Sequence, residues 1–210
     1  MNESTDSTRR EFWDIRYASG KIPWDFHGVP ASLNSFLKMS SPANVLIPGC
    51  GTGYEVRAFH QAGWKVTAID FSPVAIEQAR IHLGELVRFV FFGDFFKHDF
   101  GARRFDMIYE RTFLCALPPD SWLAYVNRTA QLLRPGGRLT GIFLYGEESE
   151  PPPFPLTKAK AQELFGDKFS LLRSDPVEDS LPLFVGKEHW QEWGLKISQT
   201  SSRSGSNQKQ

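Results

Sequence analysis

A glycine-rich turn followed by an acidic residue is the feature of this sequence that points most directly to chemistry. Gly49, Gly51 and Gly53 come directly after the apolar run of residues 44–48. Glycine lets the backbone pass close to a ligand. Asp70 ends the next apolar run, where a carboxylate accepts hydrogen bonds from both hydroxyls of a ribose. The spacing therefore predicts a nucleoside site where two parallel strands end.

The glycine pattern distinguishes between classes of nucleotide. A dinucleotide site has the pattern G-x-G-x-x-G, whose third glycine would stand at position 54, where this chain has Tyr54. No G-K-[ST] sequence follows the turn, so a P-loop is excluded. The turn fits a ligand with a ribose and no phosphates, and S-adenosylmethionine is such a ligand. Tyr54 correspondingly disfavours a nicotinamide-dependent oxidoreductase.

Asp94 and Phe95 extend the expected cofactor site. They follow the third predicted strand, so we expect them at the same edge of the sheet as Gly49 and Asp70. The Asp94 carboxylate can accept a hydrogen bond from the adenine amine. Phe95 can cover the face of the adenine ring. Phe71, directly after Asp70, is assigned to the same cofactor site.

Short β-type runs alternate with helical patterns along the chain, which is typical of parallel βαβ units. Strands are predicted at residues 44–48, 65–70, 87–92, 105–110 and 138–145, with two further candidates at 169–173 and near 190–197. Helices are predicted at residues 8–18, 54–62, 72–83, 118–133 and 157–165. Residues 134–137 are expected to end the helix of residues 118–133, and residues 146–155 to form a proline-rich loop. The predicted fold is α/β and Rossmann-like, with a doubly wound, mainly parallel sheet of seven strands and an N-terminal helical lid.

Composition places the chain among globular proteins of ordinary type. With 210 residues, a single domain is expected over residues 9–197, between disordered termini at 1–8 and 198–210. Formal net charge is zero, so nucleic acid is not an expected partner. The two cysteines suit a reducing compartment. We recognise no signal peptide, and no apolar run reaches the ~18 residues that a membrane-spanning helix needs. We therefore expect a cytoplasmic protein that forms a monomer or a weak homodimer. The five histidines lack metal-ligand spacing, so no metal site is predicted.

Several motifs together resemble one family of methyltransferases. They are Phe12-Trp13-Asp14 with Tyr17 and Gly20, Pro23-Trp24-Asp25, Ile47-Pro48-Gly49-Cys50-Gly51, Phe105-Asp106-Met107-Ile108-Tyr109-Glu110-Arg111, Phe113-Leu114-Cys115-Ala116-Leu117, and Pro152-Pro153-Phe154 ahead of Leu164-Phe165-Gly166. The set resembles the thiopurine S-methyltransferase family of class I S-adenosylmethionine-dependent methyltransferases, which includes plant-type halide and thiol methyltransferases. The resemblance extends over about residues 12–193.

The resemblance implies roles for individual residues. Trp13, Tyr17 and Trp24 would form a lid over S-adenosylmethionine, and Tyr17 stands where a Trp is common in the family. Gly49 would contact the methionine moiety and Arg111 the donor. Other implied or expected site residues are Gly51, Asp70, Phe71, Asp94 and Phe95 for the cofactor, Glu110 with Arg111 for catalysis, and Phe154 with Asp179 for the acceptor.

The expected reaction is direct transfer of a methyl group to a small soft nucleophile. A thiol is the leading acceptor, with thiocyanate, bisulfide, a halide or another chalcogen species as further candidates. A soft anion needs no strong general base, which agrees with the absence of an obvious His/Asp dyad. Two alternatives stay open: an O- or N-methyltransferase acting on a larger small molecule, and a module that binds the donor without chemistry.

Overall fold

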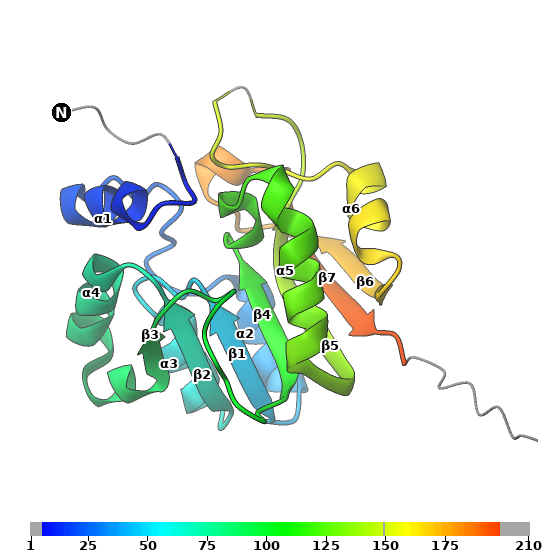
Figure 1. Ribbon diagram of the computed structural model, residues 1–210, viewed down its shortest axis with the longest axis horizontal. Helices are drawn as coiled ribbons and strands as arrows, with labels where there is room; N and C mark the ends of the chain where they lie inside the picture. Colours follow the sequence, from blue (N-terminus) through cyan, green and yellow to red (C-terminus); the bar gives the residue numbers. More distant parts are fainter. Residues whose placement is uncertain (1–5, 149, 198–210) are drawn as a thin grey trace, which may run out of the picture.

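The computed structural model describes residues 6–148 and 150–197, and its centre is a seven-stranded sheet (Figure 1). The strand order is β3-β2-β1-β4-β5-β7-β6. The strands are β1 (Asn44–Pro48), β2 (Lys65–Asp70), β3 (Val90–Phe92), β4 (Phe105–Arg111), β5 (Leu133–Leu144), β6 (Phe169–Pro176) and β7 (Glu188–Leu195). Strands β1 to β5 pair in parallel, whereas β7 pairs antiparallel with β5 and β6. The predicted Rossmann-like, mainly parallel sheet is confirmed.

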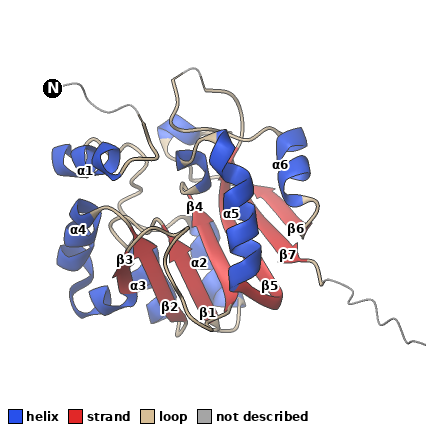
Figure 2. Ribbon diagram, viewed as in Figure 1, coloured by secondary structure: helices blue, strands red, loops and turns tan. Residues whose placement is uncertain are grey.

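Helices cover both faces of this sheet (Figure 2). They are α1 (Arg10–Ser19), α2 (Ala31–Met39), α3 (Tyr54–Gln61), α4 (Pro73–Leu83), α5 (Pro119–Leu132) and α6 (Lys158–Phe165), with short 3-10 turns η1 (Gly84–Phe89), η2 (Leu114–Ala116) and η3 (Pro182–Phe184). Side chains of α5 and α6 pack into one buried cluster, and those of α2, α3 and α4 into a second. The two clusters lie on opposite faces of the sheet, which is therefore doubly wound as predicted.

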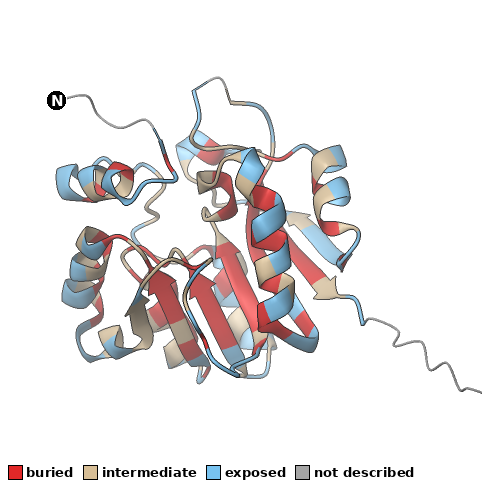
Figure 3. Ribbon diagram, in the orientation of Figure 1, coloured by how far each residue is buried: buried red, intermediate tan, exposed pale blue. Residues whose placement is uncertain are grey.

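Burial follows the pattern expected of a parallel sheet. The central strands and the inward sides of the helices are buried (Figure 3). In β1 every residue except Asn44 is buried, because both faces of a parallel strand are covered by helices. Helix α4 begins as its sequence indicates: the Ser72 hydroxyl accepts a hydrogen bond from the Ala75 N–H, and Pro73 occupies the first turn.

The structure differs from the sequence prediction in three elements. Strand β3 begins at Val90, because η1 occupies residues 84–89. Helix α5 ends before residues 134–137, as predicted, but these residues belong to β5, whose pairing with β4 shifts register between Phe105 and Met107. Helix α2 was not predicted at all, and the N–H of its first residue, Ala31, donates to Asp179 from a distant loop at 2.7 Å.

The chain is ordered nearer its beginning than the sequence indicated. Asp6 accepts hydrogen bonds from the N–H and the hydroxyl of Thr8, and Ser7 is buried. Residues 6–8 therefore belong to the folded part, which corrects the expectation for the end of segment 1–8. Residues 1–5 and 198–210, also expected to be disordered, lie outside the described residues.

Candidate active site

Three adjoining cavities lie at the carboxyl ends of the parallel strands. The central cavity has a volume of about 300 Å³, the outer cavity about 420 Å³ and the small cavity about 50 Å³. Trp24 and Thr112 line all three, and Gly49 lines the central and small cavities. The order of the strands reverses between β1 and β4, which is where open α/β sheets bind their ligands.

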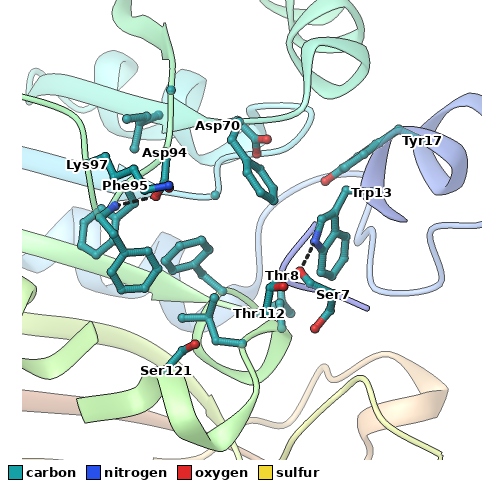
Figure 4. Close-up of a pocket in the computed structure, with 18 of the residues that line it drawn as sticks. Ser7, Thr8, Trp13, Tyr17, Asp70, Asp94, Phe95, Lys97, Thr112 and Ser121 are labelled. Carbon is teal, nitrogen blue, oxygen red and sulfur yellow. Dashed lines mark hydrogen bonds and ion pairs between the residues drawn. The ribbon is translucent and has the colours of Figure 1, made fainter. Parts of the chain in front are cut away.

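The central cavity brings together most residues that the sequence assigned to the cofactor. They are Trp13, Tyr17, Trp24, Gly49, Asp70, Phe71, Asp94 and Phe95. In Figure 4, Trp13 and Tyr17 lie on one side of the cavity, Asp94 and Phe95 on the opposite side, and Asp70 between them. Two further residues of the expected set, Gly51 and Arg111, line the small cavity instead.

The glycine turn is approached closely by aromatic side chains. Gly49 and Gly51 have φ angles of 58° and 50°, in the left-handed region that favours glycine. A Cβ atom on Gly51 would lie 2.6 Å from the Tyr17 hydroxyl, and one on Gly49 would collide with the ring of Phe113. Glycine is thus required at both positions by conformation and by space.

Asp70 is buried at the end of β2, and both of its carboxylate oxygens accept backbone hydrogen bonds. Oδ2 accepts from the N–H of Gly51 and Oδ1 from the N–H of Ser72, each at 2.9 Å. Burial raises the pKa of Asp70 to about 6, although these N–H donors favour the ionised form. A carboxylate has about four acceptor sites, so Asp70 can accept two further hydrogen bonds from a diol.

Asp94 and Phe95 form the opposite wall of the central cavity. Asp94 accepts a hydrogen bond from the Phe96 N–H at 2.8 Å and lies 3.4 Å from the Lys97 ammonium. Phe95 is buried and packs edge-on against Phe113 with ring centroids 5.5 Å apart. The wall therefore combines a partly exposed carboxylate with fixed rings.

The N-terminal rings are fixed to one another and to the chain before them. Trp24 packs edge-on against Trp13 and Tyr17, with centroid distances of 5.5 and 6.2 Å. The Trp13 indole N–H donates to the carbonyl of Ser7 at 2.8 Å. Ser7 and Thr8 also line the central cavity, and no sequence signal had pointed to either.

A buried ion pair stands beside the small cavity. The Arg111 guanidinium lies 3.6 Å from the Glu55 carboxylate, and the two side chains are 10% and 11% exposed. Burial raises the pKa of Glu55, and the charge of Arg111 opposes that rise. Within residues 6–148 and 150–197, Arg111 Nε and the Tyr109 hydroxyl have no hydrogen-bond partner. Asp25 also lines this cavity and accepts from the His27 N–H at 2.7 Å.

Glu110, a residue expected to be catalytic, lines none of these three cavities. Its side chain is buried, with Oε1 accepting from the N–H groups of Phe113 and Leu114 at 2.9 and 2.8 Å. Oε2 accepts from the Tyr125 hydroxyl at 2.6 Å. Burial raises its pKa to about 7. Glu110 therefore holds together the turn after β4, and Arg111 pairs with Glu55 instead of with its neighbour in sequence.

The two residues expected at the acceptor also lie outside the outer cavity. Phe154 packs against the apolar cluster under α5, while the neighbouring Pro152 and Pro153 line the outer cavity. Asp179 caps the first turn of α2 and lines a separate surface hollow. The predicted loop thus reaches the outer cavity through its prolines.

The outer cavity combines apolar surface with charges of both signs. Its lining includes Trp13, Ile15, Arg16, Lys21, Trp24, Cys115, Glu148, Glu150, Pro152, Pro153, Leu183 and Phe184. Thr112, at the meeting point of the three cavities, has a φ of 58°. A left-handed φ is rare for a β-branched residue, and such strain is concentrated at functional sites.

The described part of the chain, residues 6–148 and 150–197, offers neither a metal-binding cluster nor a membrane-spanning helix. No group of three His, Cys, Asp or Glu side chains is placed to hold a metal ion in this part of the chain. Nor does any helix there have the length and apolar character needed to cross a membrane.

Comparison with known proteins gives a consistent result. The family model of thiopurine S-methyltransferase (TPMT) matches residues 8–201. A probable thiol methyltransferase 2 of Arabidopsis thaliana is 31% identical over 159 residues, covering 72% of this chain and 70% of the relative. A thiopurine S-methyltransferase of Vibrio atlanticus (strain LGP32) is 29% identical over 199 residues, covering 84% and 91%. A 1,6-didemethyltoxoflavin-N1-methyltransferase of Burkholderia thailandensis, solved with S-adenosylhomocysteine, has a TM-score of 0.71 at 24% identity, covering 90% and 87%, and shares the fold.

Proposed function

The chain belongs to the thiopurine S-methyltransferase family, and from this premise we propose that it transfers a methyl group from S-adenosylmethionine to a thiol. The observation that carries the proposal is the placement of a buried acid, a glycine turn and N-terminal rings around one cavity that adjoins a second. In this proposal the central and small cavities hold the donor. The outer cavity holds the acceptor.

The central cavity fits the nucleoside part of the donor. Asp70 would accept from the ribose hydroxyls with the lone pairs left free by Gly51 and Ser72. Asp94 would accept from the adenine amine, and the ring of Phe95 would contact the base. The volume of about 300 Å³ is at the lower end of that of small-molecule sites.

The small cavity fits the charged amino-acid end of the donor. Arg111 has a buried Nε without a partner among the described residues, so a carboxylate beside it would satisfy an unpaired donor. Asp25 has one oxygen 2.7 Å from the His27 N–H and the other 3.4 Å from the Thr52 hydroxyl, which leaves acceptor capacity for an ammonium. The donor therefore would lie across Gly49, which lines both cavities.

The protein's part in the reaction is to align and to exclude water. The bound donor supplies a methyl group on a sulfonium centre. When a thiolate attacks that methyl, a new carbon–sulfur bond forms, the bond from the methyl to the sulfonium sulfur breaks, and S-adenosylhomocysteine leaves, so charge is lost. Removal of water favours such a step. Trp13 and Trp24 line both the central and the outer cavity, so their rings would shield the reacting atoms and attract the cation by about 1–2 kcal/mol. A thiol that reacts as its thiolate has already lost its proton, so no side chain has to act as a general base.

A panel of acceptors tests the proposal. Isothermal titration should show that S-adenosylmethionine and S-adenosylhomocysteine bind and that NAD does not. Headspace gas chromatography with alkyl thiols, thiocyanate and iodide should then detect methylated volatiles. Turnover on a phenol or an amine, with silence across the thiol panel, would favour the O- or N-methyltransferase instead.

We also propose that the protein acts in the cytoplasm as a monomer or weak homodimer, without nucleic acid as a partner. Its formal net charge of zero and its two buried free cysteines support this. Size-exclusion chromatography with light scattering should give a mass near the 23.9 kDa of one chain, and a stable larger assembly would contradict it.

A further inference from the structure

Helix α1 is fastened to helix α4 by two hydrogen bonds. The Ser72 hydroxyl donates to Oδ1 of Asp14 at 2.6 Å. Nearer the end of α1, the side-chain N–H of Gln78 donates to the carbonyl of Tyr17 at 2.8 Å. These contacts join segments that are far apart in the sequence, and they hold α1 beside α4.

Ser72 connects three parts of the structure, and its side chain is fully buried. Its hydroxyl caps α4 by accepting from the Ala75 N–H at 3.1 Å, and the same hydroxyl donates to Asp14. Its backbone N–H donates to Oδ1 of Asp70 at 2.9 Å. Asp14 on α1 is therefore connected through one residue to the acid at the end of β2.

Asp14 stands between the two rings that α1 contributes to the central cavity. Trp13 precedes it in sequence, and Tyr17 follows one helical turn later, on the same face as Trp13. The Tyr17 hydroxyl in turn lies against Gly51. Any movement of α1 away from α4 would withdraw both rings from the cavity.

We propose that Asp14 is a positioning residue for the methyl donor: by accepting the Ser72 hydroxyl, its carboxylate holds α1, with Trp13 and Tyr17, over the site of Asp70. The proposal rests on the function proposed above. A hydrogen bond to a carboxylate is stronger than one between neutral groups, and the Ser72 side chain that donates this one is fully buried. Because S-adenosylmethionine would bind with α1 in contact with α4, the bound methyl donor and the Asp14–Ser72 hydrogen bond should stabilise one another.

Asp14 has a second partner that provides a matched control. Arg10 lies 3.4 Å from Oδ2 of Asp14, but its side chain is 48% exposed. An exposed pair of this kind contributes little. The Arg10→Gln variant removes the ion pair and leaves the Ser72 bond, whereas Asp14→Ala removes both. Asp14→Asn keeps an oxygen that can accept from Ser72.

The test measures donor binding and the protection of α1 on the full chain. Isothermal titration with S-adenosylhomocysteine should show Asp14→Ala weakened about tenfold or more. Asp14→Asn and Arg10→Gln should stay within about threefold of the wild type. In hydrogen exchange, the ligand should protect residues 10–19 in the wild type and much less in Asp14→Ala, while the turn at residues 49–53 stays protected in both.

A cycle with Ser72 separates positioning from simple loss of stability. Ser72→Ala should weaken binding and also lower the melting temperature, since it removes the cap of α4. Adding Asp14→Ala to Ser72→Ala should change affinity little further. Equal affinity and equal protection of residues 10–19 in Asp14→Ala and wild type would overturn the proposal, and so would a lowered melting temperature with unchanged affinity. Failure of the wild type to bind S-adenosylhomocysteine would instead refute the proposed function.

Discussion

Replacement of Glu110 with Gln should change how the stability of the protein depends on pH. The carboxylate accepts hydrogen bonds from Phe113, Leu114 and Tyr125, all inside the protein. Burial still raises its pKa from 4.5 to about 7, so the folded state binds this proton more tightly than the unfolded state does. The stabilising contribution of the proton is complete below pH 4.5 and is lost as the pH rises through 7.

The magnitude follows from the two pKa values. A difference of one pKa unit corresponds to about 1.4 kcal/mol, so raising the pH from 4.5 to above 7 should remove about 3 kcal/mol of folding free energy from the wild type. A Gln at position 110 cannot ionise, and the variant lacks this loss. The difference in folding free energy between the two proteins should therefore shift in favour of the variant by most of about 3 kcal/mol between pH 5 and pH 8. This shift does not depend on the size of the difference at pH 5.

Urea unfolding at the two pH values measures this change directly. Glu163→Gln is the matched control, because Glu163 is 70% exposed and pairs with Lys160 on the surface. That control should show no comparable gain. A free-energy difference between Glu110→Gln and wild type that is independent of pH would refute the reasoning from burial.

The same variant decides whether Glu110 takes part in the chemistry. Because Glu110 lines none of the three cavities, Glu110→Gln should keep kcat within about threefold at neutral pH. Loss of a general base usually lowers the rate by about 10²–10⁴-fold. A loss of that size in a folded variant would restore the catalytic role that the sequence first indicated.

Substitutions at Asp70, Gly51 and Arg111 test the proposed donor site. Affinity for S-adenosylhomocysteine should fall as the pH falls through about 6, because Asp70 then takes up a proton. Titration at pH 5 and 7.5 should show this fall in the wild type but not in Asp70→Asn. That variant should bind at least tenfold more weakly than the wild type. Gly51→Ala should abolish binding in the same assay, since its Cβ would lie 2.6 Å from the Tyr17 hydroxyl. Adding Tyr17→Phe should restore affinity only in part, because the φ of 50° at position 51 stays unfavourable for alanine. Arg111→Gln should leave Glu55 buried without its partner, so thermal melts should show a lower melting temperature and a smaller shift on adding S-adenosylhomocysteine. Unchanged affinity in Asp70→Asn or Gly51→Ala, or an unchanged ligand shift in Arg111→Gln, would remove that residue from the proposed site.

Much of the lining of the central cavity was predictable from sequence because its signals are local. Gly49 and Gly51 follow β1 directly, Asp70 ends β2, and Asp94 follows β3. Each signal lies at a strand end, and parallel pairing brings strand ends to one edge without further information. The cap at Ser72 was local in the same way.

The features that sequence analysis missed depend on contacts between distant segments. Glu55 pairs with Arg111 only because α3 and the end of β4 meet at the small cavity. Asp179 has an acidic side chain suited to catalysis, yet it caps α2, a helix that was not predicted. Glu110 stands near a strand end like Asp70, but its carboxylate accepts from the N–H groups of Phe113 and Leu114 and lines none of the three cavities. A residue type and its place at a strand end do not fix the direction of the side chain.

The two sides of the site therefore differ in how freely they can change. The turn that would bind the donor is carried by the ends of the strands, where Asp70 and Gly51 are hydrogen-bonded to one another. The outer cavity is lined in part by the loop carrying Pro152 and Pro153 and by η3 with Phe184, neither of which belongs to the sheet or lines the central cavity. Substitutions in those segments can alter the outer cavity without moving the turn that would bind the donor. Acceptor preference should consequently respond to exchanges at the prolines and Phe184, while affinity for S-adenosylhomocysteine stays the same; a parallel loss of both would mean that the cavities are not independent.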